Sequence, residues 1–575
     1  MINLFLALSG FWLVVVAIIA FIIIIGVIIT VHELGHLFFA KRAGILCHEF
    51  SIGMGPVIYK HQFKETTFTI RAIPIGGYVA MAGEENLTDI VKFNDQIGLN
   101  LENDKVKEII LDEKVESQIT GNVFEYDFEG KGENKLHISL RTETGNNYYE
   151  IADDAFFVFS KNKRYQIEPY DRSFDSKSKW KRFITLFAGA MNNFILAILI
   201  YIIISFATGV PNYDSNVIGE VTYSETMEYP AYKAGLQKDD KIIEVNGNKI
   251  DTWTDFQKEL ENIFKENNTT IPLKVLRGTE EKSFNIEAYT YIVSIGLSNM
   301  GSSTYGLKNI TVDNKQISGL EVGACNVRYI NTPSNKIKTG DILTGISVTY
   351  DEKDKENPQN IDFENKEITS WSQLITIFKD IKSASKIKFQ YYSKNTDDTY
   401  TLVDYEASGI AEPYTDEVLN NQRIEKIQQK IGVAPTTHFS FFGCIGNAFA
   451  QFGNDFTLIF RTLKLLIAPS GVRQVGVQNL SSFVGIFSMV ESYINSGFLS
   501  LLGLTAMLSV NIGVVNLLPI PALDGGRILF LIIEAITRKK PSKKVENIIN
   551  NIFFVLILAL FVVVTVFDIM RIINK

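Results

Sequence analysis

Two histidines and a glutamate lie at the end of an apolar segment that has no charged residue from Met1 to Val31. His32 and His36 are four positions apart. At about 3.6 residues per helical turn they share one face of a helix, where both imidazoles can bind one metal ion. Glu33 can reach a water molecule on that metal without being a ligand. The spacing predicts metal-dependent hydrolysis, with His32 and His36 as ligands and Glu33 as general base.

The apolar surroundings strengthen this prediction. A short pattern of this kind also occurs by chance on soluble helices. Inside a bilayer, however, an ionisable carboxylate costs about 2.5–3.5 kcal/mol on the insertion scale. Glu33 therefore needs a functional reason to be there. Gly35 is expected to keep the approach to the metal uncrowded.

A catalytic zinc ion uses three protein ligands and one open position, so a third ligand is needed. The best-placed acid is Asp524, within the apolar stretch "NIGVVNLLPIPALDGGRILF" at 511–530. Pro519 and Pro521 break a helix just before it, and backbone freed at membrane depth must be satisfied by protein or water. We therefore expect Asp524 to line a polar cavity as the third zinc ligand. The alternative is an aspartate that only caps a helix.

Long apolar stretches predict a membrane protein, since about 20 apolar residues span a bilayer. The basic clusters at 41–42, 177–182 and 538–544 lie on one side of the membrane if the N-terminus is outside, as the positive-inside rule requires. Both termini are then outside. The expected spans are 5–40, 183–210, 497–536 and 549–570.

Polar regions separate the spans. The motif "PAYKAGLQKDDKIIEVNG" at 230–247, with a weaker second copy, resembles tandem PDZ domains, which take peptides as added strands. A spacer that binds nothing is the alternative. The expected regions are a membrane-associated β-hairpin at 50–84, a small β-rich cytoplasmic insertion at 85–176, PDZ-like α+β domains outside the membrane at 215–300 and 301–412, and interfacial amphipathic helices at 420–495.

The hairpin region offers a means of holding an unwound substrate. "TFTIRAIPIGGYVAM" at 67–81 combines alternating strand residues with Pro74, Gly76 and Gly77. We expect strand residues 67–73 to present a free edge to which an extended substrate adds, with Gly76 and Gly77 among the substrate-binding residues.

These motifs together resemble the site-2 protease family of intramembrane zinc metalloproteases, in its bacterial regulator-of-sigma branch with tandem PDZ domains. "HELGH" at 32–36 and "NLLPIPALDGG" at 516–526 carry the resemblance, with "FSIGMGP" at 50–56 and "NLSSFVGIF" at 479–487 in the family's order. The resemblance implies a fold of four transmembrane helices, with Zn²⁺ held by His32, His36 and Asp524.

The second span departs from the family pattern. "GAMNN" at 189–193 has Ala190 where the family has proline, but it keeps Asn193. By resemblance, Asn193 holds the substrate or stabilises developing charge near the zinc. Asn511 and Asn516 would contact the substrate backbone.

The resemblance implies cleavage within transmembrane segments of single-span proteins that another protease has already trimmed, such as anti-sigma factors or remnant signal peptides. The expected location is the bacterial cytoplasmic membrane, as a multi-pass protein in the lipid bilayer. Two alternatives are a non-catalytic PDZ-bearing membrane receptor and a zinc-dependent transporter. The net charge of −8 gives no support for a nucleic-acid partner.

Overall fold

A computed structural model describes residues 11–573, apart from 84–89, 113, 131–134, 143–144, 161–162, 225–226, 293–294, 300–301, 303, 324–335, 353–354, 357, 359, 380–385, 408–426 and 468–479. Residues 5–10 of the first predicted span and 420–426 of the predicted interfacial region lie outside this described part. The chain divides into two compact units, Met1–Ile204 with Ala448–Ile459 and Ser481–Lys575, and Ser205–Asn447 with Phe460–Leu480.

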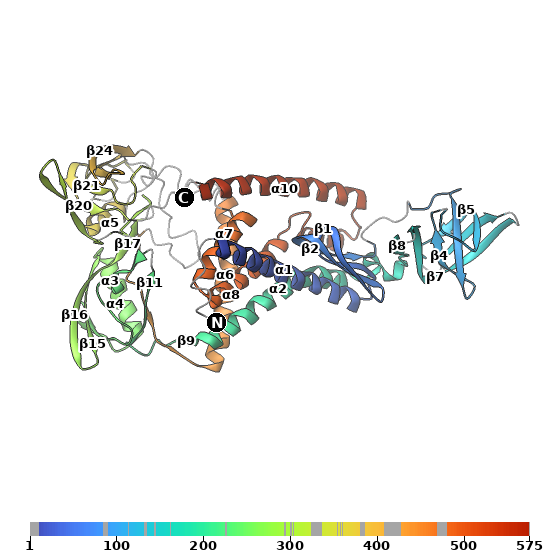
Figure 1. Cartoon of the computed structure of the whole chain (residues 1–575), viewed down its shortest axis with the longest axis horizontal. Helices are drawn as coiled ribbons and strands as arrows, with labels where there is room; N and C mark the ends of the chain where they lie inside the picture. Colours follow the sequence, from blue (N-terminus) through green and yellow to red (C-terminus); the bar gives the residue numbers. More distant parts are fainter. Residues whose placement is uncertain are drawn as a thin grey trace. The chain divides into compact units, whose positions relative to one another are not determined.

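In the described part of the chain, four helices are long and apolar enough to cross a membrane (Figure 1). They are α1 (Phe11–Arg42), α2 (Lys179–Thr208), α8 (Phe498–Asn516) and α10 (Lys543–Ile573). The third predicted span is divided, because α8 ends at Asn516 and the next helix, α9 (Asp524–Thr537), follows a turn at 517–523. The two prolines in this turn account for the break.

Two further helices pack against the spans. In α7 (Phe483–Asn495), Val490 and Ile494 join a core with residues of α1 and α8. Within the first unit, α6 (Phe441–Ile467) contacts α2, where Tyr201 donates a hydrogen bond to the buried Asp455. The predicted interfacial region therefore contains a helix whose polar face packs on a span.

The strands β1 (Cys47–Phe63) and β2 (Thr66–Met81) form a hairpin. Each strand bends and supplies two paired segments to one sheet. Residues 66–71 pair with 57–63 on one side and with 49–52 on the other, and 77–81 then pair with the free side of 47–52. The prediction that 67–73 form the free edge is wrong. Gly76, whose φ is 81°, lies where β2 bends back, so 77–81 become one edge of this sheet and 57–63 form the other.

The insertion is a separate β-domain. Its strands are β3 (Gln96–Glu102), β4 (Lys105–Ile110), β5 (Ile119–Asp127), β6 (His137–Thr142), β7 (Gly145–Ser160) and β8 (Lys163–Gln166). They pair in the order β4-β3-β5-β6-β7-β8, and an additional parallel pairing of β4 with β7 closes the first five strands into a ring. Thirteen buried apolar residues, Leu99 and Phe157 among them, fill its interior.

In the second unit, the first of two α+β domains has the sheet order β14-β13-β15-β16 with α4 (Trp253–Lys265). Its strands are β13 (Lys241–Val245), β14 (Asn248–Lys249), β15 (Thr270–Arg277) and β16 (Glu280–Glu287). A late segment completes this domain. Ile431 lies in its core, and β26 (Val433–Pro435) pairs with β10 (Ile218–Val221).

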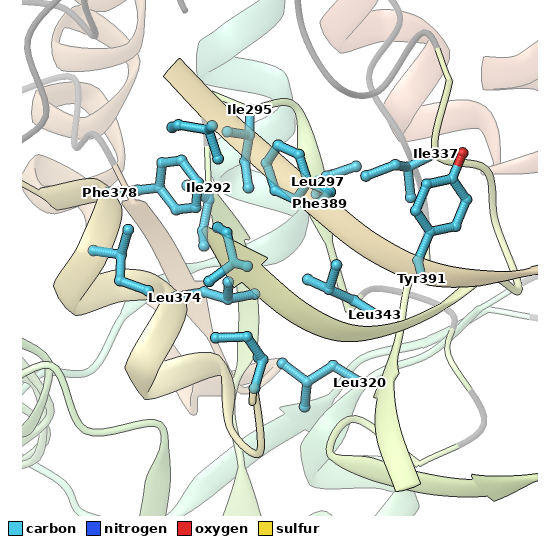
Figure 2. Packing of buried hydrophobic residues seen from close by; sticks show 14 of the residues in the cluster. Ile292, Ile295, Leu297, Leu320, Ile337, Leu343, Leu374, Phe378, Phe389 and Tyr391 are labelled. Atoms are coloured by element: carbon cyan, nitrogen blue, oxygen red, sulfur yellow. The ribbon is translucent and has the colours of Figure 1, made fainter. Parts of the chain in front are cut away.

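The other α+β domain is therefore inserted within the first, whereas the sequence pattern predicted two successive domains. It contains β19 (Leu307–Val312), β20 (Lys315–Glu321), β21 (Ile342–Thr349), β22 (Phe363–Glu367), β23 (Lys386–Lys394), β24 (Tyr400–Ala407) and α5 (Trp371–Lys379). Figure 2 shows its core, where Phe378 of α5 lies near Phe389 of β23. Ile292, Ile295 and Leu297 belong to this core, so it begins before residue 301.

Candidate metal centre

The helix α1 carries the first two predicted ligands. His32 and His36 are each 6% exposed, and their rings lie 4.9 Å apart. Gly35, between them, is not the residue that keeps the metal approach open. A Cβ at Gly35 would lie 2.4 Å from the carbonyl oxygen of Ala188, so this glycine allows α1 and α2 to pack closely.

A tight turn places Asp524, the third predicted ligand, at the first position of α9. A Cβ on Gly525 would lie 2.1 Å from the Leu518 carbonyl oxygen, and one on Gly526 would lie 2.4 Å from that of Ile520. The two glycines therefore let α9 fold back against the turn. Ala522 has a φ of 75°, a left-handed conformation that is unusual for a residue with a side chain.

Three side-chain atoms from these two segments form a small triangle. The Asp524 Oδ2 atom lies 3.1 Å from His32 Nε2 and 3.2 Å from His36 Nε2. The two Nε2 atoms are 3.3 Å apart. Ligands about 2.1 Å from a tetrahedral zinc ion are separated by about 3.4 Å, so this triangle has the size that one zinc ion requires.

A hydrogen bond beside the triangle orients one of its atoms for binding a cation. The carbonyl oxygen of Thr185, on α2, lies 2.8 Å from His36 Nδ1 and can only accept a hydrogen bond. Neutral His36 therefore carries its proton on Nδ1 and turns the Nε2 lone pair toward Asp524. Lone pairs meeting a carboxylate oxygen repel one another unless a metal ion or a proton lies between them. The residues present therefore fit zinc.

Gly189 of α2 forms the wall beside this triangle. A Cβ at this position would lie 2.3 Å from His36 Nε2 and 2.7 Å from His32 Nε2. Any larger residue would enter the space where the predicted ligand atoms converge. Gly189 thus does what the sequence analysis expected of Gly35.

The predicted asparagines do not share one environment. Asn193 is fully buried, and its Nδ2 atom lies 3.2 Å from His32 Nδ1. Its Oδ1 atom has no hydrogen-bond partner among the described residues. Asn516, at the end of α8, lies 3.5 Å from His32 Nε2 through its amide nitrogen. Asn511 is five positions earlier, about 140° around the helix, so it faces a different direction.

The edge of the β1–β2 sheet that 77–81 form reaches Glu33. A Cβ on Gly77 would lie 3.0 Å from Glu33 Cγ and 2.8 Å from the Ser51 carbonyl oxygen. The structure thus brings Gly77 to the predicted general base. Gly76 forms the preceding bend and packs near Met54 instead.

A charged network holds this sheet in shape. Arg71 donates hydrogen bonds to Glu49 at 2.7 Å and to the Tyr78 hydroxyl at 2.7 Å. Burial opposes ionisation of Glu49, but hydrogen bonds from Thr69 and Arg71 outweigh it and lower the pKa of this carboxyl. Burial, followed by the hydrogen bond with Glu49, raises the pKa of Tyr78 to about 12. The tyrosine therefore stays neutral, and the network keeps one carboxylate against one guanidinium.

Sequence reasoning missed several contacts that hold the metal centre together. Asn192 donates to the Val31 carbonyl oxygen at 3.1 Å, which joins α2 to α1. Arg182 pairs with Glu534 of α9 at 2.8 Å, and both side chains are largely buried. From the sequence, Arg182 is only one of the basic residues that indicate the orientation of the second span. The sequence did contain one indication of this ion pair. Glu534 is an acidic residue within the apolar sequence of α9, ten positions after Asp524.

Comparison with known proteins assigns the family. The model of peptidase family M50 matches residues 20–560. The chain belongs to this family. The predicted site-2 protease resemblance is thereby confirmed, and the chain is a zinc-dependent protease.

Relatives of this M50 protease match over nearly their whole length. A protein of Staphylococcus aureus (strain N315), whose name includes "zinc metalloprotease", is 32% identical over 562 residues, covering 97% of this chain and 98% of the relative. Zinc metalloprotease RasP of Geobacillus kaustophilus is 29% identical over 559 residues, covering 96% of this chain and 98% of the relative. RasP of Bacillus licheniformis is 30% identical over 559 residues, covering 96% and 99%.

Proposed function

We propose that this protein is an intramembrane endopeptidase, with zinc held by His32, His36 and Asp524 and with Glu33 as its general base. The convergence of three possible ligand atoms at 3.1–3.3 Å, two of them on the helix that also carries Glu33, is the observation that carries the proposal. When bound there, zinc would lower the pKa of a water molecule and polarise the scissile carbonyl.

The chain's own residues then perform the proton transfers. Glu33 takes a proton from the attacking water and later delivers it to the amine of the leaving product. The carbonyl of Thr185 keeps the proton of His36 on Nδ1, so Nε2 remains a ligand. The amide atom of Asn193 that has no partner among the described residues supports a role for Asn193 in holding the substrate.

An extended stretch of the substrate would bind along the free edge at 77–81. Peptide bonds in a helix are shielded and hydrogen-bonded, so a transmembrane segment must unwind before it is cut. Addition to a sheet edge supplies hydrogen bonds to the unwound backbone. The closeness of Gly77 to Glu33 supports this route, because the edge ends where the proton is transferred.

The substrates would be single-span membrane proteins that another protease has trimmed, such as anti-sigma factors or remnant signal peptides. The protein would lie in the bacterial cytoplasmic membrane, with both termini and the two α+β domains outside, as the basic clusters indicate. These domains would act as PDZ-like filters that exclude substrates with an intact external domain. Their pattern of sheets with one amphipathic helix each supports this assignment.

The test is cleavage of a tagged single-span substrate in membranes. Glu33→Gln should lower the rate by about 10²–10⁴-fold, because a glutamine cannot accept the proton. A zinc chelator should have a similar effect on the unaltered protein. Glu491→Gln, which changes an acid of α7, is the matched control and should keep activity. Undiminished cleavage by Glu33→Gln would overturn the mechanism.

A further inference from the structure

The helix α10 has anchored ends and an exposed middle. Side chains along its central turns, including Phe554, Val555 and Leu558, are 52–62% exposed. Near the C-terminal end, Val564 and Asp568 are 4% and 1% exposed. An apolar helix with so little packing along its middle is positioned by the contacts at its ends.

The C-terminal anchor is the carboxylate of Asp568. Its Oδ2 atom accepts hydrogen bonds from the Ser482 amide at 2.6 Å, the Ser482 hydroxyl at 2.7 Å and the Gly485 amide at 3.1 Å. These groups form the N-terminus of α7, where unpaired amides and the helix dipole favour a negative charge. A Cβ on Gly485 would lie 2.6 Å from the same oxygen, so glycine makes room for the bond.

This anchor connects to the histidine-bearing helix through α7. Val490 and Ile494 of α7 share a core with Ile24 and Ile28 of α1. Ile28 is one helical turn before His32. The rings of Phe21 and Phe483 lie 6.3 Å apart, edge to face, near the start of α7. A shift of α7 would therefore displace the residues of α1 that pack against it.

The N-terminal anchor connects to the other half of the metal centre. Asn550 Oδ1 accepts a hydrogen bond from the Ala522 amide at 3.1 Å. Ala522 is in the left-handed conformation, two residues before Asp524. Because that conformation disfavours a side chain, an external bond that holds its amide helps to keep the turn in place.

We propose that Asn550 and Asp568 are positioning residues that use α10 to hold the Asp524 turn and the His32–His36 helix at the separation that one zinc ion needs. The inference rests on the proposed function for the three ligands. Neither residue contacts the triangle. Asn550 contacts the turn that precedes Asp524, and Asp568 contacts α7, which packs on the helix that carries His32 and His36.

The test uses the purified, zinc-loaded full chain in detergent micelles. Zinc transfer to a coloured chelator is timed, and hydrogen exchange is followed over residues 517–524. Asn550→Leu should speed zinc release about tenfold and increase exchange in the turn. Asn551→Leu, which alters the exposed neighbouring asparagine, is the matched control and should change neither.

Two rescues separate positioning from simple loss of stability. Asn550→Asp keeps an acceptor for the Ala522 amide and should release zinc at nearly the normal rate. Ala522→Gly, added to Asn550→Leu, should slow release again, because glycine adopts a positive φ without strain. Asn550→Gln moves the acceptor without removing it and replaces Asn550→Leu if the leucine variant does not fold.

At the other end, Asp568→Ala should speed zinc release several-fold, and Asp568→Asn should have a smaller effect because one acceptor oxygen remains. Unchanged release in either Asn550→Leu or Asp568→Ala would overturn the inference for that residue and its end of α10, as would an equal effect of Asn551→Leu. His32→Ala distinguishes the two proposals. If it retains zinc, the ligand assignment fails. If it loses zinc while Asn550→Leu releases normally, the positioning inference alone fails.

Discussion

Asp524 and Asp568 are both carboxylates in apolar helical sequence, yet they face opposite kinds of atoms. Asp524 Oδ2 faces two imidazole Nε2 atoms, of which that of His36 presents a lone pair. Asp568 Oδ2 faces two amide groups and a hydroxyl, all of which donate. The protein therefore satisfies Asp568 by itself, whereas the atoms around Asp524 are those that the proposed zinc ion would bind.

The two sites share one feature of construction. Each has a glycine whose missing side chain leaves space for the polar group, Gly189 beside His36 and Gly485 beside Asp568. Neither space can hold a Cβ atom without movement of its neighbours. Substitutions at the acids and at the glycines can therefore test whether the two sites differ in the way their geometry indicates.

The largest expected effect separates the two acids. Asp524→Asn should weaken zinc binding by more than about 100-fold, because a neutral amide replaces an anionic ligand. Asp568→Asn should keep zinc affinity within about tenfold and should instead lower the melting temperature, since it weakens a charged helix cap worth about 1 kcal/mol. Competition with a chelator and thermal unfolding measure both quantities. Equal loss of zinc in the two variants would contradict the comparison.

Substitution of the two glycines should show the same contrast between zinc binding and stability, with smaller effects. Gly189→Ala should reduce zinc affinity by about 10–100-fold, because the new methyl group enters the space between the histidines. Gly485→Ala should destabilise the end of α10 by about 1–3 kcal/mol while zinc remains bound. The measurements are zinc content after dialysis and thermal unfolding. Normal zinc content in Gly189→Ala would show that α2 can retreat and that the wall is not required.

The smallest expected effect is on the catalytic rate alone, with zinc binding unchanged. Gly77→Ala should lower kcat several-fold with zinc content unchanged, because its methyl group would crowd Glu33 and the neighbouring strand. Gly26→Ala is the control, since no atom lies within 4 Å of a Cβ added there. Rates and zinc content are measured on the same preparations. A parallel loss of zinc in Gly77→Ala would mean that the sheet edge supports the metal ligands and not the base.

Local patterns predicted much of this molecule. Helical periodicity alone places His32 and His36 on one face, because the positions depend only on the geometry of a single helix. The four apolar stretches predicted four long apolar helices, since a bilayer demands a certain apolar length, although the third stretch, 497–536, is divided by the turn at 517–523. The two prolines predicted the break before Asp524. The family resemblance rested on short motifs, such as those at 32–36 and 516–526, which can be recognised in the sequence without the structure.

The tertiary structure decided what depends on contacts between distant segments. Only the pairing of residues 66–71 on both sides shows that they are internal and that 77–81 form an edge of the sheet, because alternation along a strand does not reveal which neighbours it has. Only packing shows that Gly189, and not Gly35, borders the metal ligands. The difference between the surroundings of Asp524 and those of Asp568 also arises from contacts between distant segments. The sequence determined that each carboxylate lies in an apolar helix, and folding decided whether lone pairs or hydrogen-bond donors meet it there.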